Sequence, residues 1–258
     1  MRIFGTPDER MFRSMNFYSD QSGILRRYNR EKTNWETHLQ NTRNFAVKAI
    51  QNKKCKSAAV LGSGWLLDVP VKEFTECFDK VILFDIRHPK SIKKRFQKQP
   101  NVVLFECDIS EFANNTYHFV KQFKNKKKRP QIDTITAQPE LILSTFDFVF
   151  SCNILNQLDI LLIDYLSDNM KLNENEILSF RKKIQQHHID LLPRKKTCLV
   201  SDYEEILHNE HDEEISRTKT IHCPVVFQKN EKWTWDFDTC MTYHNGKKTF
   251  FEVFATEM

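Results

Sequence analysis

One glycine turn constrains this chain more than any other feature of its sequence. An apolar run leads directly into Gly62-Ser63-Gly64, and the next apolar run ends at Asp85. Glycines let backbone approach a ligand closely, and an acid at the tip of the following strand can accept hydrogen bonds from a ribose diol. The order of strand, turn, helix, strand and acid therefore predicts a nucleoside-containing cofactor at the carboxyl ends of parallel strands.

The rest of the turn narrows the kind of cofactor. The chain holds only five glycines, so two in one turn are not a by-product of composition. After Gly64 the chain continues with Trp65, whereas the dinucleotide fingerprint continues to a third glycine. That third glycine lets a helix N-terminus pack close to a pyrophosphate. This departure favours S-adenosylmethionine, which has an adenosine and an amino-acid end but no phosphate. A tight turn without a ligand is the alternative, and the position of Asp85 argues against it.

Length and composition fit one α/β domain with extensions. Of 258 residues, 40% are hydrophobic and 28% are charged, which is enough apolar mass for a core. No apolar run approaches the roughly 20 residues that span a bilayer, and the first residues lack a signal-peptide core. The seven cysteines are widely spaced without a Cys-x-x-Cys pair, which is typical of a reducing compartment. We therefore expect a cytoplasmic protein without a membrane segment, whose oligomeric state the sequence does not give.

Positive charge is concentrated in one segment. The net charge is +5, and lysine and arginine crowd the basic run 121–129. Aromatic residues do not alternate with these charges as a base-stacking surface requires, apart from Phe123. The pattern favours a solvated loop over a phosphate-binding surface, and hence a small-molecule substrate over a nucleic acid.

Hydrophobic periodicity predicts the order of helices and strands. We expect strands at 57–62, 80–86, 102–107, 146–152, 197–201, 222–228, 233–240 and 249–256, helices at 31–51, 66–77, 89–98, 154–166 and 173–192, and a charged loop at 204–220. Asn173 and Glu176 form a capping-box pattern. Strands that alternate with helices, and then follow one another directly, imply an α/β fold. Its mostly parallel, seven-stranded sheet would have an antiparallel C-terminal edge and helices on both faces.

These segments together resemble class I S-adenosylmethionine-dependent methyltransferases. The likeness is carried by Val60-Leu61-Gly62-Ser63-Gly64, Asp85, Cys107-Asp108-Ile109 and the strand 146–152 with Asn153. More narrowly, the chain resembles an uncharacterised bacterial group of that superfamily through Leu67-Asp68-Val69-Pro70, Asp85-Ile86-Arg87-His88-Pro89, and Asn153, Gln157 and Leu158. The resemblance runs from Trp35 to the end of the chain. It implies a Rossmann-like methyltransferase fold and S-adenosylmethionine as cofactor, but it brings no substrate. We divide the chain into a helical lead-in, 1–52, and a Rossmann-like domain, 53–258, with a basic insertion near 112–140.

The cofactor site follows from the resemblance and from the chemistry of its side chains. We expect it to be formed by Gly62, Ser63, Gly64, Asp68, Asp85, Ile86, Asp108 and Ile109. Asp85 would take both ribose hydroxyls in charge-assisted hydrogen bonds. Asp108 would accept from the adenine amine, with a helix N-cap as its alternative role. Asp68 would hold the ammonium group of the methionine end, with a helix-entry acid as its alternative role.

Methyl transfer from a sulfonium requires mainly positioning and removal of the acceptor's proton. We expect catalytic side chains at the ends of the fourth and fifth strands and on two helices, namely Asn153, Gln157, Asp202, His38 and His188. Asn153 and Gln157 would share one helix face, and Asp202 would be either a base or a simple strand-end acid. Tyr203 and Trp235 are expected to bind the substrate, although a strand that places Trp233 and Trp235 on one side can also bury both rings in the core.

Other chemistries find less support. The turn after Cys152 lacks the Pro-Pro-aromatic sequence that holds an amino group of a base, and no proline precedes Cys152 as cytosine C5 chemistry requires. The histidines and acids of 208–214 lack a recognised ligand spacing, so we expect no metal site. Two alternatives to a small-molecule methyltransferase stay open. One is a non-catalytic cofactor-binding or scaffold protein, and the other is a nucleic-acid methyltransferase or binder that uses the basic run 121–129.

Overall fold

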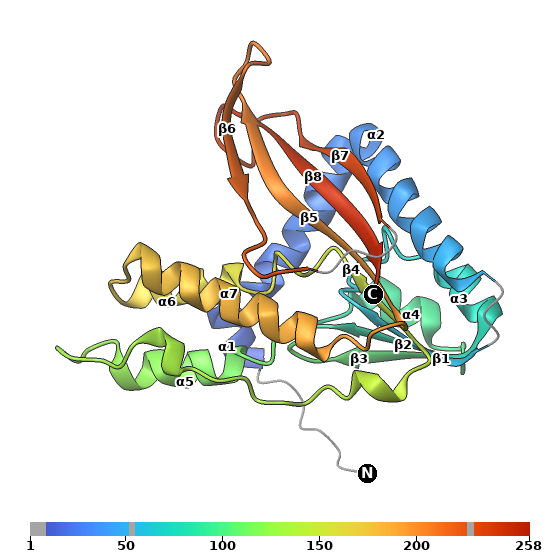
Figure 1. Cartoon of the computed structure of the whole chain (residues 1–258), viewed down its shortest axis with the longest axis horizontal. Helices are drawn as coiled ribbons and strands as arrows, with labels where there is room; N and C mark the ends of the chain where they lie inside the picture. Colours follow the sequence, from blue (N-terminus) through green and yellow to red (C-terminus); the bar gives the residue numbers. More distant parts are fainter. Residues whose placement is uncertain (1–8, 52–54, 226–229) are drawn as a thin grey trace.

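A computed structural model describes residues 9–51, 55–225 and 230–258. Among these residues, eight strands form one sheet in the order β3-β2-β1-β4-β5-β8-β7, and β6 pairs with β5 (Figure 1). The strands are β1 (Cys55–Leu61), β2 (Phe78–Asp85), β3 (Val102–Glu106), β4 (Phe148–Cys152), β5 (Thr197–His208), β6 (Glu214–Lys219), β7 (Asn230–Asp238) and β8 (Lys248–Glu257). The helices are α1 (Glu9–Ser14), α2 (Phe17–Ile50), α3 (Val71–Cys77), α4 (Lys90–Phe96), α5 (Ala113–Phe123), α6 (Ile160–Asn169) and α7 (Glu174–Leu191), with short 3₁₀ turns at Ile132–Thr134 and Leu143–Thr145.

The strand order confirms the predicted fold class. The five strands from β3 to β5 run parallel, and β8 and β7 add an antiparallel edge. The chain reverses its direction of growth between β1 and β4, as in Rossmann-like sheets.

One of the eight described strands, β6, was not predicted. The segment 204–220 is not a loop, because the extended β5 and the added β6 form a hairpin there. An ion pair of 3.1 Å between Arg217 and Glu204 links its two strands. The segment was predicted as a loop because it is highly charged, and such charge is common on exposed edge strands. No strand is present at 222–225, and the remainder of the strand expected at 222–228 lies outside the described residues.

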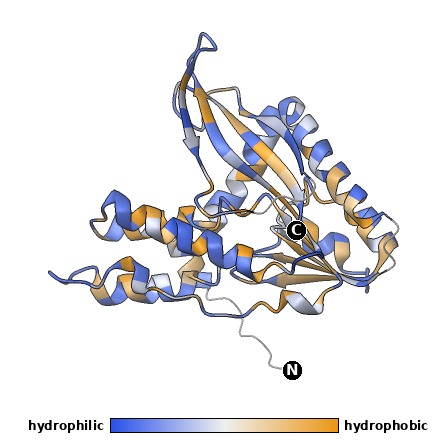
Figure 2. Ribbon diagram, in the orientation of Figure 1, coloured by the Kyte–Doolittle hydropathy of each residue, from blue (hydrophilic) through white to orange (hydrophobic). Residues whose placement is uncertain are grey.

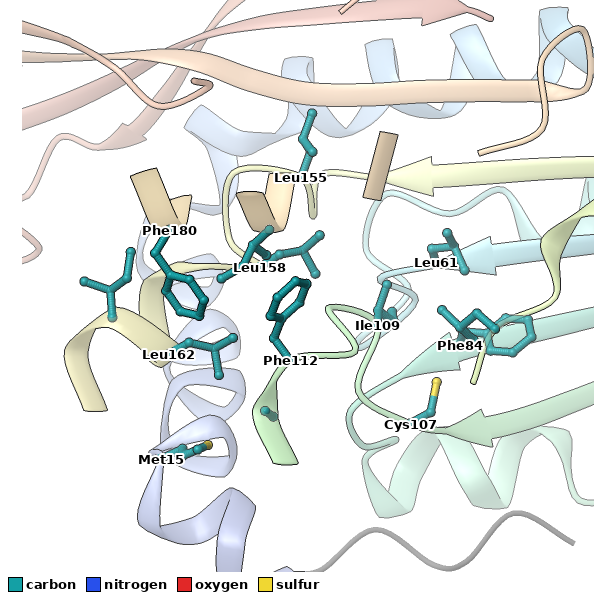
Figure 3. Close-up of a cluster of buried hydrophobic side chains, with 14 of the residues drawn as sticks. Met15, Leu61, Phe84, Cys107, Ile109, Phe112, Leu155, Leu158, Leu162 and Phe180 are labelled. Atoms are coloured by element: carbon teal, nitrogen blue, oxygen red, sulfur yellow. The ribbon is translucent and has the colours of Figure 1, made fainter. Parts of the chain in front are cut away.

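Helices cover both faces of the sheet around two hydrophobic cores. One core joins the sheet to α1, α5, α6 and α7, and Figure 3 shows part of it around Phe112 and Phe180. The other joins the opposite face to α2, α3 and α4. Figure 2 shows that the central strands are apolar, whereas β6 is polar. No described helix combines the length and the hydrophobicity needed to cross a membrane.

The long helix α2 passes from one core to the other. Phe17 near its start packs against the first core, whereas Trp35 and Leu39 belong to the second. Within the helical lead-in, the sequence predicted a regular helix only over 31–51, because residues 17–30 are polar with scattered aromatics. Glu31 interrupts the helix with φ −103° and ψ 18°.

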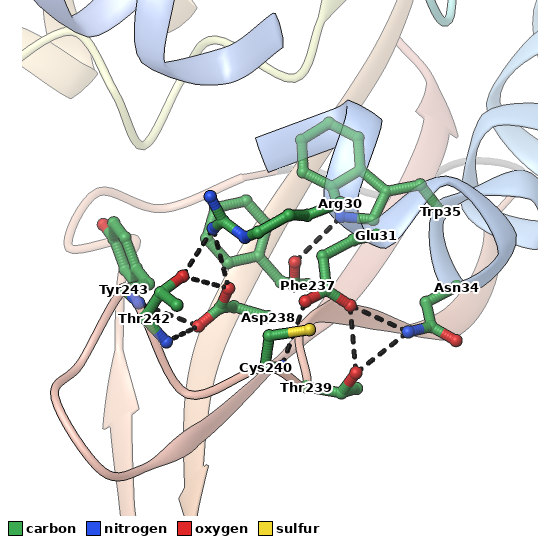
Figure 4. A network of polar contacts seen from close by, with 10 residues as sticks. All are labelled: Arg30, Glu31, Asn34, Trp35, Phe237, Asp238, Thr239, Cys240, Thr242 and Tyr243. Carbon is green, nitrogen blue, oxygen red and sulfur yellow. Dashed lines mark hydrogen bonds and ion pairs between the residues drawn. The ribbon is translucent and has the colours of Figure 1, made fainter. Parts of the chain in front are cut away.

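A polar network fixes α2 at this interruption (Figure 4). The Glu31 carboxylate accepts hydrogen bonds from the hydroxyl of Thr239 at 2.9 Å and from the backbone N–H of Cys240 at 3.0 Å. Asp238 forms an ion pair of 3.2 Å with Arg30. The segment after β7 therefore holds the middle of α2 against the sheet.

Two predicted helices start later than the sequence suggested. The helix expected from 66 begins at Val71, directly after Pro70. The helix expected over 154–166 begins only at Ile160, and residues 155–159 form turns. Asn153 has a left-handed backbone with φ 47°, which an α-helix does not admit. The capping box of α7 is confirmed, because the Asn173 side chain accepts the N–H of Glu176 at 2.9 Å.

Candidate functional site

A cavity of about 460 Å³ lies at the carboxyl ends of the central strands. Ligands of open α/β sheets bind at this switch point of the strand order, here between β1 and β4. Helix α2 contributes the cavity wall on one side, and β5, β7 and β8 contribute another. The predicted site residues that line it are His38, Gly62, Ser63, Gly64, Asp68, Asp85, Ile86, Asp108, Ile109, Asn153, Gln157, Asp202 and Trp235.

The glycine turn is required by the fold itself. Gly62 has φ +82°, and a Cβ there would lie 2.7 Å from the carbonyl oxygen of Cys152 at the end of β4. Gly64 has φ +24°, and its N–H donates to Asp85 at 2.7 Å. Close approach of β1 and β4 thus leaves no room for a side chain at Gly62, whether or not a ligand is bound.

We expect Gly62→Ala to lower the free energy of unfolding by about 2–4 kcal/mol, because the added methyl group meets backbone and the left-handed φ is strained. Gly246→Ala is the matched control, since Gly246 also has a positive φ, +76°, but has open space where a Cβ would be. It should cost only about 1–2 kcal/mol. Urea unfolding of both variants measures the difference, and equal losses would contradict the role of the Cys152 contact.

Asp85 lies at the tip of β2 and is almost completely buried. Its carboxylate accepts from Gly64 N–H at 2.7 Å and from the Gln21 amide at 2.9 Å. Burial raises the pKa of Asp85 to about 6, despite the hydrogen bonds from backbone N–H groups. A carboxylate has roughly four lone-pair sites, so it can still accept a further donor from the cavity.

Two predicted cofactor residues carry structural roles as well. The Asp108 carboxylate accepts from Ser110 N–H at 2.9 Å and from Ala113 N–H at 2.7 Å, so it stabilises the start of α5. The Ser63 hydroxyl donates to Phe84 O at 3.1 Å and contacts Nε2 of His88 at 2.9 Å. The hydroxyl of Ser63 therefore ties the turn to β2, and only the rest of the residue is available to a ligand.

A buried polar chain links the glycine turn to β7. The Asn153 amide contacts Asp68 at 2.6 Å and His38 Nε2 at 3.2 Å, and Trp233 donates to His38 Nδ1 at 3.1 Å. Burial lowers the pKa of His38 to about 3, so its ring is neutral. Because an indole N–H can only donate, the ring proton of His38 is on Nε2. A histidine in this state cannot take up a proton at Nε2. Because Asn153 Nδ2 is a donor as well, its 3.2 Å contact with His38 Nε2 is not a hydrogen bond.

Asp202 and Asn156 form a second polar pair in the cavity. Asn156 Nδ2 donates to Asp202 Oδ2 at 2.5 Å. Asp202 Oδ1 and Asn156 Oδ1 are buried without a hydrogen-bond partner among the described residues. Burial raises the pKa of Asp202 to about 7, with Glu205 adding to the effect. Asp202 is thus a carboxyl group that changes charge near neutral pH and has a free oxygen atom.

Aromatic rings form the wall opposite the glycine turn. The ring of Trp235 stacks on His38 with centroids 3.9 Å apart, and Trp35 stacks on Phe237 at 5.6 Å. The indole N–H of Trp35 donates to the carbonyl of Phe237 at 2.8 Å, and Figure 4 shows this bond beside the network that fixes α2. Trp35, His38, Trp235 and Phe237 all line the cavity.

Two predicted residues do not reach the cavity. His188 is buried on α7, where its Nε2 contacts the hydroxyl of Ser151 at 2.8 Å, and burial lowers its pKa to about 3. Tyr203 packs against Phe254 with Lys232 over its ring. Gln157 does line the cavity, but it does so from a turn, where its amide donates to Asn153 O at 2.7 Å, and not from the shared helix face that was predicted.

Sequence reasoning missed several polar residues of this site, among them Gln21 and Asn156. Gln21, whose amide bonds Asp85, stands in a stretch of α2 without a recognisable motif. Asn156 lies between the predicted Asn153 and Gln157, and it was passed over because a helical face was assumed there. Recognition of the turn at 153–159 would have brought Asn156 into consideration.

The charged segments set aside in the sequence lie away from the cavity. The lysines of the basic run 121–129 are exposed, and Arg129 pairs with Glu176 at 2.8 Å. In the β5–β6 hairpin, Asp212 pairs with Lys248 at 2.5 Å. Neither the basic run nor 208–214 contributes to the lining of the cavity.

Comparison with solved structures finds methyltransferases at low similarity. The 1,6-didemethyltoxoflavin-N1-methyltransferase of Burkholderia thailandensis, solved with 1,6-didemethyltoxoflavin and S-adenosylhomocysteine, is 13% identical, with 100% of this chain and 93% of that chain covered and a TM-score of 0.41. The N-methyltransferase NodS of Bradyrhizobium japonicum WM9, solved with S-adenosylhomocysteine, is 9% identical, with 85% and 87% covered and a TM-score of 0.37. No protein-family model and no curated protein matches the sequence. The fold class therefore rests on the strand order of the chain itself.

Proposed function

We propose that this protein is an S-adenosylmethionine-dependent methyltransferase that acts on a small molecule. The observation that carries the proposal is one cavity with two sets of lining residues. The first half is the glycine turn with Asp85, the acid at the tip of the following strand, and the second half is the end of β5 with Asp202. A nucleoside site alone would need only the first half. The second half supplies a buried carboxyl group with a free oxygen, which a transfer reaction can use.

The residues around the glycine turn suit each part of the cofactor. Asp85 would accept a ribose hydroxyl, and Ile86 and Ile109 supply apolar surface for an adenine ring. Burial raises the pKa of Asp68, and a cofactor ammonium beside it would stabilise its charged form. When bound, the cofactor supplies an activated methyl group on a sulfonium. The chain's own task is then to hold the acceptor and to remove its proton.

Asp202 is the proposed base. Asp202 lines the cavity, and its Oδ1 is buried without a partner among the described residues. Its pKa of about 7 leaves it largely ionised at slightly alkaline pH, yet basic enough to take a proton. His38 is not proposed as the base, since its Nε2 already carries a proton. His188 is not part of the proposal, because it does not line the cavity.

A small acceptor fits the charge of the site better than a polymer. Six carboxylate side chains line the cavity, namely those of Asp20, Asp68, Asp85, Asp108, Asp202 and Glu205, against the cations Arg27, Arg181 and Lys219. The basic run 121–129 is not among the lining residues. The carboxylates of the cavity would repel a phosphate backbone, and the basic run 121–129, outside the cavity, would attract it.

Calorimetry with S-adenosylhomocysteine tests the cofactor half of the proposal. We expect binding by the unmodified protein, and a loss of about 1.5–3 kcal/mol of affinity in Asp85→Ala, the usual worth of hydrogen bonds to a charged group. Affinity should also fall as the pH drops below about 6, because a hydroxyl donor prefers the ionised carboxylate. Asp79→Ala is the control, since Asp79 is exposed on the same strand.

If the protein does not bind S-adenosylhomocysteine, or if Asp85→Ala and Asp79→Ala bind it equally well, Asp85 does not bind the ribose. If the cofactor binds but no labelled methyl group leaves it with any acceptor, the non-catalytic scaffold alternative is favoured instead.

A further inference from the structure

The compartment around Asp202 has polar atoms that are buried and unused. Asn156 Oδ1 and, in the ionised carboxylate, Asp202 Oδ1 accept hydrogen bonds only, and neither has a partner among the described residues. Because Asn156 Nδ2 bonds Asp202 Oδ2 at 2.5 Å, the two free oxygens belong to one rigid pair. Buried polar atoms in native proteins are almost always satisfied, so this pair is expected to meet two donor hydrogens of a ligand.

A third buried atom without a partner is a hydrogen-bond donor and not an acceptor. The indole Nε1–H of Trp235 is a donor without a partner in the described part of the chain, and its side chain is almost completely buried in the cavity wall. An indole N–H requires an acceptor atom. Because Asp202, Asn156 and Trp235 all line one cavity, a molecule bound there is expected to offer donors to the first two and an acceptor to the third.

The surroundings select against a charged molecule. The guanidinium of Arg27 lies 4.6 Å from the ring centroids of both Phe237 and Tyr243, so a cation already occupies these aromatic faces. His38 covers one face of Trp235. A cationic amine offers no acceptor atom and would leave Trp235 Nε1 unsatisfied, while an anion would meet Asp202 and Glu205.

We propose that the methyl acceptor is an uncharged nitrogen heterocycle that presents a ring N–H and a neighbouring donor to Asp202 and Asn156, and a carbonyl or ring nitrogen to Trp235 Nε1. The inference rests on the proposed function and names the substrate class of that same site. The ring proton passes to Asp202 Oδ1, and the N–C bond forms as the methyl carbon–sulfur bond breaks. The products are the N-methylated ring, a neutral thioether and a protonated Asp202, so charge balances.

Binding of two cyclic imide-type probes, uracil and quinazoline-2,4-dione, tests this acceptor class. Calorimetry is carried out on the full chain saturated with S-adenosylhomocysteine. We expect at least one dione to bind, and its N,N′-dimethylated form to bind at least about tenfold more weakly, because both donors are lost. Benzylamine and benzoate, as cationic and anionic rings, should bind more weakly than the dione.

Two variants separate the donor contact from general damage. Trp235→Phe keeps an aromatic ring but removes the N–H, and it should weaken the dione by about five- to tenfold without changing the affinity for S-adenosylhomocysteine. Tyr117→Phe alters an aromatic residue outside the cavity and should leave both affinities unchanged. Thermal unfolding confirms that each variant is folded.

The possible outcomes distinguish this inference from the function on which it rests. If S-adenosylhomocysteine binds but neither dione does, the acceptor class is wrong and the cofactor assignment stands. Equal binding of the dione and its dimethylated form, or tighter binding of benzylamine or benzoate, also overturns the acceptor class. If S-adenosylhomocysteine does not bind, the proposed function fails, and the acceptor class fails with it.

Discussion

Asp202→Asn should abolish methyl transfer and at the same time make the folded protein more stable above neutral pH. An amide cannot take the acceptor's proton, and loss of a positioned base typically lowers a rate by about 10²–10⁴-fold. The amide still fits, because its oxygen can accept the hydrogen bond from Asn156 that Asp202 Oδ2 accepts now. The rate is measured as transfer of a labelled methyl group to the dione that binds.

The gain in stability follows from the direction of the Asp202 pKa. Folding raises this pKa from its ordinary value of 3.8 to about 7, so the folded protein holds a proton that the unfolded chain releases. The unfavourable contribution of Asp202 is absent below about pH 4, grows as the pH rises toward 7, and is complete above it. At pH 8 we expect Asp202→Asn to gain about 1–4 kcal/mol in unfolding free energy, and at pH 4 nothing.

The same group sets the expected pH dependence of the reaction. Asp202 must be ionised to act as a base, so kcat/KM should rise with pH and level off above about 7. Other ionisable groups that line this part of the cavity are Glu205, His244, Lys219 and Arg181. Asp164→Asn is the control, since burial also raises the pKa of Asp164 but its side chain does not line the cavity. Unchanged rates in Asp202→Asn would rule out its role as the base.

The fold was predictable because its signals are local. Apolar runs that end at Gly62 or Asp85 predict buried parallel strands, because the hydrophobic pattern of a sequence is the main signal of its secondary structure. The capping box of α7 is equally local, since its two residues lie three positions apart. The β5–β6 hairpin was missed because charged side chains on an exposed edge hide the alternation of a strand.

The site was only partly predictable, because its polar pairs join distant parts of the chain. Asp85 was predictable from its position at the end of a strand. The Gln21 amide that donates a hydrogen bond to it lies 64 positions earlier in the chain, and no local pattern connects the two residues. The pairing of Asn156 with Asp202 spans 46 positions. His188 satisfied the same sequence criteria as His38, and only the packing of α7 turns it away from the cavity.

Trp235→Ala should unfold the protein at a markedly lower urea concentration and also damage the site, because the ring belongs to both the core and the cavity wall. Its exposed fraction is 7%, and it packs on His38 at 3.9 Å, on Trp35 at 4.8 Å and on Phe237 at 4.8 Å. Truncation of such a ring leaves a cavity and costs about 3–5 kcal/mol in unfolding free energy. The sequence offered core or substrate wall as alternatives for Trp235, and in this structure the ring is buried in the core and also lines the cavity.

Two further variants separate these roles. Trp233 is less buried, and its N–H donates to His38 at 3.1 Å, so Trp233→Ala should cost less stability, about 1–3 kcal/mol. Trp235→Phe keeps most of the packing and should cost less than about 1.5 kcal/mol, yet it removes the unpartnered indole N–H that is proposed to bind the acceptor. If Trp235→Ala cost no more stability than Trp233→Ala, the ring would not be part of the core. If Trp235→Phe bound the dione as tightly as the unmodified protein, the wall of the acceptor compartment would have to lie elsewhere.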